Sequence, residues 1–543
     1  MPTETEIKLA FAPAAGKRLA RDLMRHPAVR EAKRGRTRTA RVVSTYYDTP
    51  DGRLAAAGIA LRVRNDGGRW LQTVKGPPLT GSGGALSARA EFEWPLAAKR
   101  LDGARLATTP WRKVLGKAYA RGDLAPRFTT DFMRSTVPLA FADATTAKLC
   151  IDQGTIRTHA ATHDVKRAGS AHAGTTRRRP AARFPIAEIE IELVAGNALR
   201  LFDLAQALAH DLPLAVAPAS KAERGRALVN GWPDGWRLPV RATDVAIDKK
   251  TTAAQALRTI AGGCLHQIAA NATGLCADRD PEWAHQMRIG TRRLRSCLAH
   301  DAGGWPPDRV QPLQAEIKWL AGILGTARDW DVFGTQTVPP MAAQFADEPR
   351  AATGLRRLRA RVAAQRRIAR AAAIVAVQSP RFAALILAAG AVCVTPPAPP
   401  PGEKAQAREE LARSVKDFAR ERLAHRHKQL VRRAAHLAHG THEERHAARI
   451  AAKKARYAAE FFAPLFSQKR AGRYRKALAA LQEVLGRYND GVTATRLALV
   501  IDRGEDGAAS GIVRGWTAAQ SVALEPELTR AAEEFATVKR FWT

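Results

Sequence analysis

Cysteine, aromatic side chains and long apolar runs are all scarce in this sequence. The five cysteines among 543 residues are an odd number without CxxC spacing, which argues against a disulfide framework or a zinc site and favours a reducing compartment. The longest apolar run, residues 382–394, is too short to span a bilayer, so we expect a buried helix there. The N-terminal segment lacks the basic and apolar regions of a secretory signal. We therefore expect a cytoplasmic protein that does not associate with membranes.

Acidic residues are scarce relative to basic ones. Asp and Glu number 51 against 87 Lys and Arg, which gives a formal net charge of +36. This excess favours a polyanionic partner, and nucleic acid, polyphosphate, acidic lipid and the ribosome are all candidates. Aromatic residues make up only 6% of the chain, and the basic segments lack the interleaved stacking groups that bind single-stranded nucleic acid. We expect nucleic acid to bind only nonspecifically.

The character of the sequence changes near residue 230. Before this point, short segments alternate apolar and polar residues, which is the period of β-strands. After it, the chain is rich in Ala, Arg and Leu with helical periodicity and almost no strand pattern. We predict a first domain over residues 1–228, a linker over 229–250 and a helical domain over 251–543. The proline-rich segment 396–402 is expected to divide the helical domain, and residues 168–183 to form a mobile loop between strands.

The helical domain contains an internal repeat. HQMRIGTRRLR begins at His285 and HAARIAAKKAR at His446, an offset of 446 − 285 = 161 residues. LGTARDWD begins at Leu324 and LGRYNDGV at Leu485, and 485 − 324 is again 161. Two separate motifs that share one offset indicate a duplication, and each unit is long enough for about four helices. The predicted repeats cover about residues 251–395 and 403–543.

Charged residues fall on one face of each predicted strand, because successive strand side chains point to opposite faces. An open antiparallel sheet with one solvated face would explain any single strand. Closing the sheet would instead gather the mixed charges in a tunnel, where carboxylates could hold hard cations such as Mg²⁺ or Mn²⁺ and basic side chains could clamp phosphate oxygens. The residues that share a face are Glu4, Glu6 and Lys8; Arg62 and Arg64; Thr73 and Lys75; Arg89, Glu91 and Glu93; Lys148 and Asp152; and Glu188, Glu190 and Glu192.

An ordered series of motifs over residues 3–228 is similar to one enzyme superfamily. The series starts with TEIK and continues with YYDTPDGRL, GIALRVR, TVKG, RAEFEWPL, FTTDFMR, IDQGTI, EIEIEL and SKAERG. It resembles the CYTH (triphosphate tunnel metalloenzyme) superfamily, and looks closest to bacterial inorganic triphosphatases that carry a C-terminal CHAD domain. The resemblance implies an α+β multidomain protein. A closed antiparallel β tunnel with flanking helices would precede an all-α domain of two four-helix-bundle-like repeats.

The same resemblance implies a role for each tunnel residue. Either Glu4 or Glu6 would position or deprotonate the attacking water, with Lys8 as a further catalytic group and Mg²⁺ or Mn²⁺ as the cofactor. Glu188 would lie at the tunnel mouth or be solvated, and the loop after Ile156 could alter access. The implied metal-binding residues are Glu4, Glu6, Glu190, Glu192 and, as a further candidate, Asp152. The implied substrate-binding residues are Lys8, Arg62, Arg64, Lys75, Glu91, Glu93, Arg134 and Lys221.

The first duplicated motif places cations along one face of each helix, within roughly an 80° arc at ~100° per residue. A solvated face normally mixes the two signs of charge for i, i+4 support. These stripes carry no acid, which favours anion binding over simple solvation. The stripes are His285, Arg288, Arg292 and Arg295, then His446, Arg449, Lys453 and Arg456, with Arg293 and Lys454 beside them.

These helices resemble CHAD domains, which present basic residues and histidines to polyphosphate, over about residues 251–543. The resemblance adds Arg328 to the polyphosphate-binding residues. Asp329 and Asp490 are expected to orient arginines, whereas Asp331 has no acidic counterpart because Val492 takes its place. Asn489 also matches the second motif, and the plausible secondary contacts are Lys318, Arg473 and Lys476.

The favoured function is a metal-dependent inorganic triphosphatase with a polyphosphate-binding helical module, so triphosphate and polyphosphate are the expected partners. One alternative is a non-catalytic protein associated with polyphosphate granules, although a pure anion binder gains nothing from clustered glutamates. Another is adenylate cyclase or thiamine triphosphatase chemistry on the same scaffold. The sequence has no distinctive aromatic patch that would form a pocket for a nucleobase or a thiazolium ring.

Overall fold

The protein is described by a computed structural model that divides into two compact units. The first comprises Met1–Pro239 and Ser379–Val394, and the second Val240–Gln378 and Thr395–Thr543. Most of the predicted loop at 168–183, together with parts of the predicted linker and of the proline-rich segment, lies outside the described residues. The described residues are 3–79, 84–159, 182–231, 238–242, 247–299, 304–397, 409, 412–437, 440–501 and 507–543.

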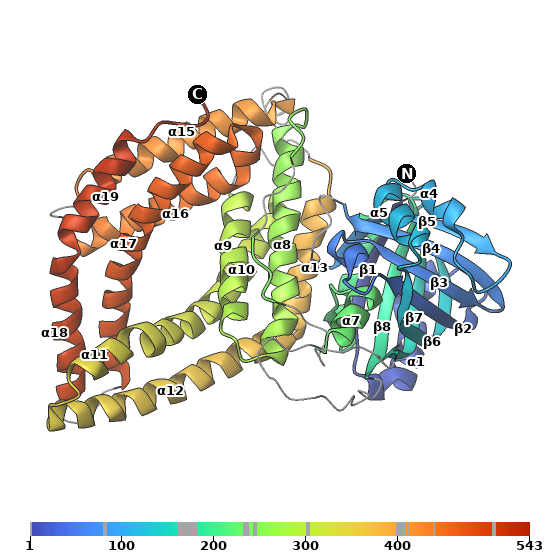
Figure 1. Cartoon of the computed structure of the whole chain (residues 1–543), viewed down its shortest axis with the longest axis horizontal. Coiled ribbons are helices and arrows are strands. Elements are labelled where there is room, and N and C mark those ends of the chain that lie inside the picture. Colours follow the sequence, from blue (N-terminus) through green and yellow to red (C-terminus); the bar gives the residue numbers. More distant parts are fainter. Residues whose placement is uncertain are drawn as a thin grey trace. The chain divides into compact units, whose positions relative to one another are not determined.

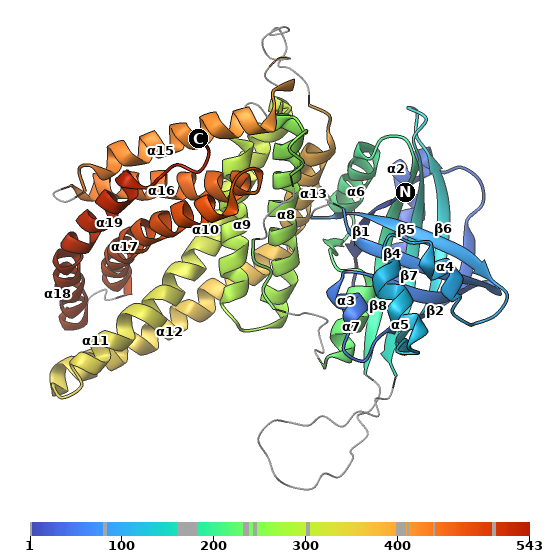
Figure 2. The same cartoon turned by 45° about the horizontal axis from the view of Figure 1, so that its top comes forward.

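The first unit is a closed antiparallel barrel, as predicted (Figures 1 and 2). The strand order is β5-β4-β3-β2-β6-β7-β8-β1-β9, and the ring closes because β1 pairs with both β8 and β5. Closure leaves eight strands without a free edge, so every charged strand face can point into one interior. The strands are β1 (Thr3–Ala10), β2 (Arg38–Asp48), β3 (Ala60–Asp66), β4 (Arg69–Pro78), β5 (Leu86–Leu96), β6 (Ala125–Ala140), β7 (Thr146–Thr158), β8 (Arg183–Ala195) and the short β9 (Ala215–Val216).

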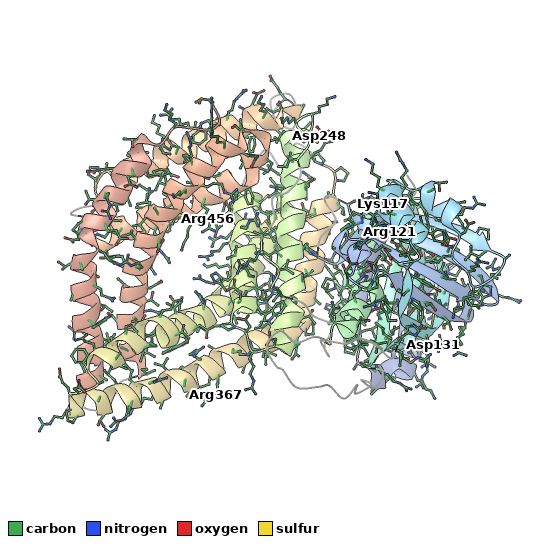
Figure 3. All side chains as sticks on the ribbon, viewed as in Figure 1. Lys117, Arg121, Asp131, Asp248, Arg367 and Arg456 are labelled. Carbon is green, nitrogen blue, oxygen red and sulfur yellow. The ribbon has the colours of Figure 1, made fainter. Side chains whose placement is uncertain are left out.

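Helices cover the apolar outer face of the barrel. Leu61 and Val74 alternate with the charged positions, are at most 1% exposed, and pack in one cluster with Leu115 of α5. Lys117 of α5 and Arg121, the residue after this helix, are exposed and are labelled in Figure 3. The helices of this unit are α1 (Gly16–Arg25), α2 (Pro27–Ala32), α3 (Arg53–Ala56), α4 (Gly103–Ala107), α5 (Arg112–Ala120), α6 (Leu199–Asp211), α7 (Lys221–Val229) and α13 (Pro380–Val394), with a 3-10 turn, η1 (Pro13–Ala15).

Helix α13 forms part of the first unit although it is distant in sequence. It is the buried helix expected from the apolar run, since Ile386 and Leu387 are 0% exposed. The sequence assigns this segment to the first helical repeat, whereas its packing against α6 and β9 groups it with the barrel. Its contact with α6 is close: a Cβ added to Gly390 would lie 2.3 Å from the ring of Phe202. Only glycine allows this approach.

The second unit is entirely helical in its described residues, and its helix starts follow the predicted offset. Helix α10 begins at Pro307 and α17 at Gln468, again 468 − 307 = 161. The first helix of each half begins beside the other. The amide of Ala253 donates to the carbonyl of Arg413 (2.9 Å), and that of Val415 donates to the carbonyl of Thr251 (3.2 Å). The helices are α8 (Ala253–Ala277), α9 (Glu282–Leu298), α10 (Pro307–Val332), η3 (Phe333–Thr337), α11 (Val338–Gln344), α12 (Pro349–Gln378), α15 (Val415–Ala434), α16 (His442–Phe462), η4 (Ala463–Leu465), α17 (Gln468–Ile501), α18 (Ala508–Ala523) and α19 (Glu525–Thr537).

The two halves differ after their third helix. In the first half, α10 ends in a π-helical turn that leads to α11, which has prolines in its first turn. In the second half, α17 continues without a break to Ile501. Within the described part of the chain, no single helix is long and apolar enough to cross a bilayer; the consecutive helices α12 and α13 meet that test only as a pair.

Candidate functional site

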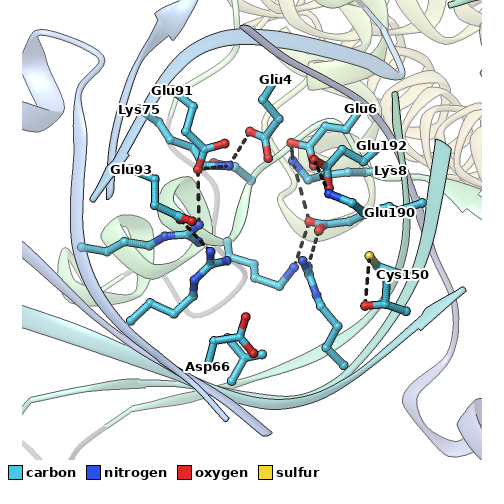
Figure 4. A pocket seen from close by; sticks show the side chains of 18 of the residues that line it. Glu4, Glu6, Lys8, Asp66, Lys75, Glu91, Glu93, Cys150, Glu190 and Glu192 are labelled. Atoms are coloured by element: carbon cyan, nitrogen blue, oxygen red, sulfur yellow. Dashed lines mark hydrogen bonds and ion pairs between the residues drawn. The ribbon is translucent and has the colours of Figure 1, made fainter. Parts of the chain in front are cut away.

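The barrel encloses a cavity of about 820 Å³ whose wall is built of opposite charges (Figure 4). Its side chains come from β1 to β8 and from the start of α7. Nearly all the residues predicted to face a tunnel line this cavity. They are Glu4, Glu6, Lys8, Arg62, Arg64, Lys75, Glu91, Glu93, Arg134, Glu190, Glu192 and Lys221.

Strand register explains why these charges meet in layers. Glu6 lies opposite Glu192 and Lys8 opposite Glu190 across the β1–β8 pair. Directly opposed residues have their Cβ atoms about 4.5–5.5 Å apart, so their side chains interact. Opposed glutamates repel one another unless a cation lies between them.

The acidic wall consists of glutamates that share too few cations. Lys75 pairs with Glu4 and approaches Glu91 at 3.5 Å. Burial raises the pKa of Glu4, but Lys75 and Lys8 outweigh it and hold that pKa at about 2. Glu6 is different: burial, assisted by the charges of Glu4 and Glu190 and opposed by its partner Lys8, raises its pKa to about 7. Glu6 is therefore a carboxyl group poised to exchange a proton near neutral pH.

The basic wall keeps donors available for an anion. Arg64 donates to Glu93 at 2.6 Å, while Arg62 lies 3.4 Å from the Tyr46 hydroxyl and 3.6 Å from Glu91. The Nε–H groups of Arg62 and Arg64 have no hydrogen-bond partner among the described residues. These two Nε atoms are shielded from solvent, but both arginines line the cavity, and guanidinium groups bind phosphate oxygens strongly.

A buried lysine occupies the carboxylate cluster best shaped to hold a metal. Oxygens of Asp152, Glu188 and Glu190 lie within 4.8 Å of one another. The Nζ of Lys221 sits among them, 2.6 Å from Asp152 and 2.9 Å from Glu190, and it also pairs with Glu188. These carboxylates raise the pKa of Lys221 against the effect of burial. The cluster holds an ammonium group in the place that a metal ion would take.

Asp152 and Glu188 therefore lie behind the cavity wall. Both are 0% exposed. Asp152 also accepts two hydrogen bonds from Arg134, at 2.7 and 2.6 Å, and Glu188 pairs with Arg224. These contacts suit Asp152 to orienting Arg134 and Lys221, and the metal ligation predicted for it stays a prediction. Neither location predicted for Glu188 is correct, because it is neither at the mouth nor solvated.

Other cavity residues were absent from the predicted site. Arg89 donates to Glu223 at 3.0 Å, and Glu223 completes a capping box with Ser220 at the start of α7. Alternation had placed Arg89 and Lys148 on the predicted tunnel face, but no role in the site was predicted for them. Arg224 follows Lys221 by one helical turn, but nothing in the sequence links it to Glu188. The additional lining residues include Arg36, Arg38, Tyr46, Arg89, Lys148, Cys150 and Ser220.

Breaking the buried network should cost stability without touching the cavity. Replacing Arg224 by methionine is expected to lower the free energy of unfolding by about 3 kcal/mol, because Glu188 keeps its buried charge with one cation fewer. Adding Glu188→Gln should recover part of this loss. Urea unfolding measures both variants, and Arg21→Met, at an exposed position of α1, is the control. A single variant as stable as the parent would contradict a structural role for the network.

The carboxylates that line the cavity suit a hard divalent cation, and one of them, Glu190, also contacts Lys8, Arg134 and Lys221. Glu4, Glu6, Glu190 and Glu192 offer oxygen ligands, which Mg²⁺ and Mn²⁺ prefer. The raised pKa of Glu6 marks a negative charge that lacks sufficient compensation. A dication at this wall would supply that compensation, so the donor set fits the predicted cofactor.

The basic stripes of α9 and α16 meet in the second unit. We call Arg288, Arg292, Arg449 and Lys453 the central cationic patch. Burial lowers the pKa of Arg288 to about 10, with the charges of Arg292 and Arg449 adding to the effect. Burial lowers the pKa of Lys453 to about 6, with further contributions from all three arginines. The two stripes therefore act on each other as one site.

Acidic residues near the patch are few. Arg288 lies 4.0 Å from Asp329, and Arg449 lies 3.8 Å from Asp490. This placement matches the predicted orienting role of the two aspartates, whereas Asp331 pairs with Arg366 at 2.9 Å. His285 Nδ1 and Arg292 Nε have no hydrogen-bond partner in the described part of the chain. Burial, followed by the charge of Arg328, lowers the pKa of His285 to about 4.

The remaining predicted polyphosphate residues divide into three groups. Arg293 is 4% exposed, lies 3.7 Å from Glu460 and stacks on Phe461, so it stabilises the core and is not available to solvent. Arg456 is exposed and donates to Glu460 at 2.6 Å. The exposed residues His446 and Lys454 line a groove between α15 and α16, with Arg295 exposed nearby on α9. The secondary candidates Lys318, Arg473 and Lys476 are all exposed.

Comparisons with known protein families match two separate parts of the chain. The CYTH domain model matches residues 2–225 and the CHAD domain model matches residues 259–499. An inorganic triphosphatase from Haemophilus influenzae is 29% identical over 247 residues, which cover 44% of this chain and 59% of that relative's length. The matched part thus spans less than two thirds of the curated relative.

Two solved structures are similar to separate parts of the chain. A CHAD domain from the plant Ricinus communis is 36% identical, with a TM-score of 0.48, over 56% of this chain and 99% of its own. A candidate adenylyl cyclase from Hippeastrum, described by its dominant triphosphatase activity, is 18% identical, with a TM-score of 0.27, over 41% of this chain and 95% of its own.

Proposed function

This chain carries a CYTH domain followed by a CHAD domain, and from that premise we propose that its barrel hydrolyses inorganic triphosphate with a divalent metal. The observation that carries the proposal is one enclosed cavity with a glutamate wall facing an arginine and lysine wall. A cavity that only held anions would gain nothing from buried, mutually repelling glutamates. The relative named inorganic triphosphatase supports the same chemistry.

We assign different cavity residues different roles in phosphoryl transfer. Arg62, Arg64 and Lys75 bind phosphate oxygens and hold the chain, while Arg134 is oriented by its fork with Asp152. A divalent ion held by Glu4, Glu190 and Glu192 would neutralise charge on the phosphates. These residues compensate the negative charge of the substrate before and during transfer.

Glu6 is the better candidate for the residue that takes a proton from water. A general base works best with a pKa near the operating pH, and the pKa of Glu6 is about 7. Glu4, with a pKa of about 2, is too weak a base for this task. We therefore favour Glu6 over Glu4 as the base and Glu4 as a metal ligand, since a glutamate that itself bound the dication would lose its raised pKa.

A hydrolysis panel with Mg²⁺ and Mn²⁺ tests the proposal. The substrates are inorganic triphosphate, longer polyphosphate, ATP and thiamine triphosphate, with phosphate release as the readout. Triphosphate is expected to give the highest kcat/KM, and chelation of the metal should abolish turnover. If ATP or thiamine triphosphate gives the highest kcat/KM, that compound is the substrate in place of triphosphate. If no compound is hydrolysed, the barrel only binds anions.

The helical unit is proposed to bind polyphosphate at the central cationic patch. The proposal is supported by the converging charges of the two helices and by the pKa values of Arg288 and Lys453, which are lowered in the absence of an anion. A chain of phosphates supplies closely spaced negative charges that could relieve this repulsion along the whole patch.

Binding at this patch should take up protons. Lys453, with a pKa of about 6 before binding, is mostly neutral at pH 7.5, and a polyanion raises that pKa. Its contribution to affinity is therefore complete below pH 6 and is lost as the pH rises through the raised value. Calorimetry in two buffers of different ionisation enthalpy should show uptake of up to about one proton from this lysine. Lys453→Arg should remove most of that uptake, and binding by the parent without any proton uptake would contradict the assignment.

A further inference from the structure

A second basic surface lies beside the central cationic patch. Helices α15 and α16 form a groove of about 490 Å³, which we call the lateral groove. Arg433 of α15 and Lys454 of α16 are its two permanent cations, and both are exposed. The lining residues are Gln429, Arg433, His442, Glu443, His446, Ala447, Ile450, Ala451 and Lys454.

Cations from two other helices, α9 and α15, converge on Lys454. Burial lowers the pKa of this lysine, and the charges of Arg426, Arg433 and Arg295 lower it further. Among the described residues, Arg295, Arg433 and Lys454 form no ion pair with a carboxylate. The one acidic lining residue, Glu443, lies in the first turn of α16. The groove therefore gathers positive charge that the described protein does not neutralise.

The lateral groove is not simply repeated by the duplication. The position equivalent to Lys454 in the first half is 454 − 161 = 293, and Arg293 is buried against Phe461 and Glu460. The cation at this position is buried in the core in the first half, whereas it is exposed to solvent in the second half. A site at Lys454 thus has its own geometry.

Arg295 links the groove to the central cationic patch. It follows Arg292 on α9 by three residues, which is about 4.5 Å along a helix axis. On α16, Lys453 belongs to the patch and the adjacent Lys454 to the groove. Both helices thus carry cations from one surface to the other without an intervening acid.

We propose that the lateral groove is a second site for the same polyanion, so that one long phosphate chain occupies the central cationic patch, passes Arg295 and continues between α15 and α16. This proposal rests on the polyphosphate binding proposed above. A short chain reaches only one of the two sites, whereas a long chain gains avidity from both without forming any new type of contact. The helical unit then selects for chain length.

Binding of long-chain polyphosphate and of triphosphate to the full-length protein tests the proposal. The groove variant Arg433→Gln/Lys454→Gln is compared with Lys428→Gln/Arg432→Gln, which removes two exposed charges of α15 that do not line the groove. Long-chain affinity of the groove variant should fall about tenfold, and its log–log salt slope by roughly 1.4. Triphosphate affinity should not change, because the barrel and the central patch are untouched.

The outcomes separate this inference from the proposed function. If long polyphosphate does not bind the parent protein, the polyphosphate proposal itself fails. If the parent binds and the groove variant matches the Lys428/Arg432 control, the second site does not exist. An equal loss for both chain lengths would assign the groove residues to a single short site and would overturn the selection for length.

Discussion

Replacing Glu6 by glutamine is expected to lower kcat for triphosphate by about 10²- to 10⁴-fold. The change keeps the shape of the side chain but removes a proton acceptor with a pKa of about 7. Steady-state phosphate release with saturating Mg²⁺ or Mn²⁺ measures the loss. Long-chain polyphosphate should bind the helical unit of this variant as it binds the parent, because the variant leaves the central cationic patch intact.

Unfolding cannot account for this loss, since the substitution should not destabilise the barrel. Burial and the charges of Glu4 and Glu190 raise the pKa of Glu6. A carboxyl group with a raised pKa contributes stability below its unfolded pKa and loses it as the pH rises through the folded value. In metal-free buffer, Tm of Glu6→Gln should therefore exceed that of the parent at pH 8 and match it near pH 4. Glu31→Gln, at an exposed position of α2, is the isosteric control for activity; turnover by Glu6→Gln at the parent rate would remove Glu6 from catalysis.

The barrel and most of its wall were predictable from local pattern. Strand side chains alternate, so residues such as Glu4, Glu6 and Lys8 had to share a face, and the structure confirms that the sheet closes around that face. The ordered motifs over residues 3–228 and the duplicated helical motifs identified the same two domains that the family comparisons match. Alternation gave the inward residues of each strand, whereas closure of the sheet was implied only by the family resemblance, because no local period determines that β1 pairs with β5.

The network behind the wall was not predictable in this way. Lys221 reaches Asp152 from 69 residues away, and Arg224 reaches Glu188 across 36. Their meeting depends on how α7 docks against the barrel, which no local period encodes. Asp152 and Glu190 were predicted to bind metal and Glu188 was not, whereas the structure brings all three carboxylates together around the ammonium group of Lys221.

The sequence predicted which residues share a helix face, but not which faces are covered by a neighbouring helix. The spacing of Arg288, Arg292 and Arg295 indicated a shared face, but whether a neighbouring residue is buried depends on the helix packed against it. Arg293 is adjacent in sequence to Arg292 and yet contacts Phe461 and Glu460 in the core. Sequence duplication suggested equivalent roles for Arg293 and Lys454, which tertiary packing has made different.

Replacing Arg288 and Arg449 together by glutamine is expected to reduce polyphosphate affinity by about 100-fold or more at low salt. Each guanidinium comes from a different half of the duplication, so the pair removes one central cation from each stripe. If each arginine contacts one phosphate, the log–log salt slope should fall by about 1.4 to 1.8. Titration at several salt concentrations separates this loss of contacts from a change in fold.

The thermal stability of the double variant is the most discriminating control for this prediction. Burial and neighbouring cations lower the pKa of both arginines, so their charges oppose folding when no anion is present. Tm of the double variant in anion-free buffer should equal or exceed that of the parent, and polyphosphate should raise it less. Arg359→Gln/Arg367→Gln removes the same charge from exposed positions of α12, where Arg367 is labelled in Figure 3. If the polyphosphate affinity of this control variant falls equally, the patch contributes only its share of the overall positive charge and is not a specific site. A fall confined to Arg288 and Arg449, with stability retained, can arise only from a site built for an anion.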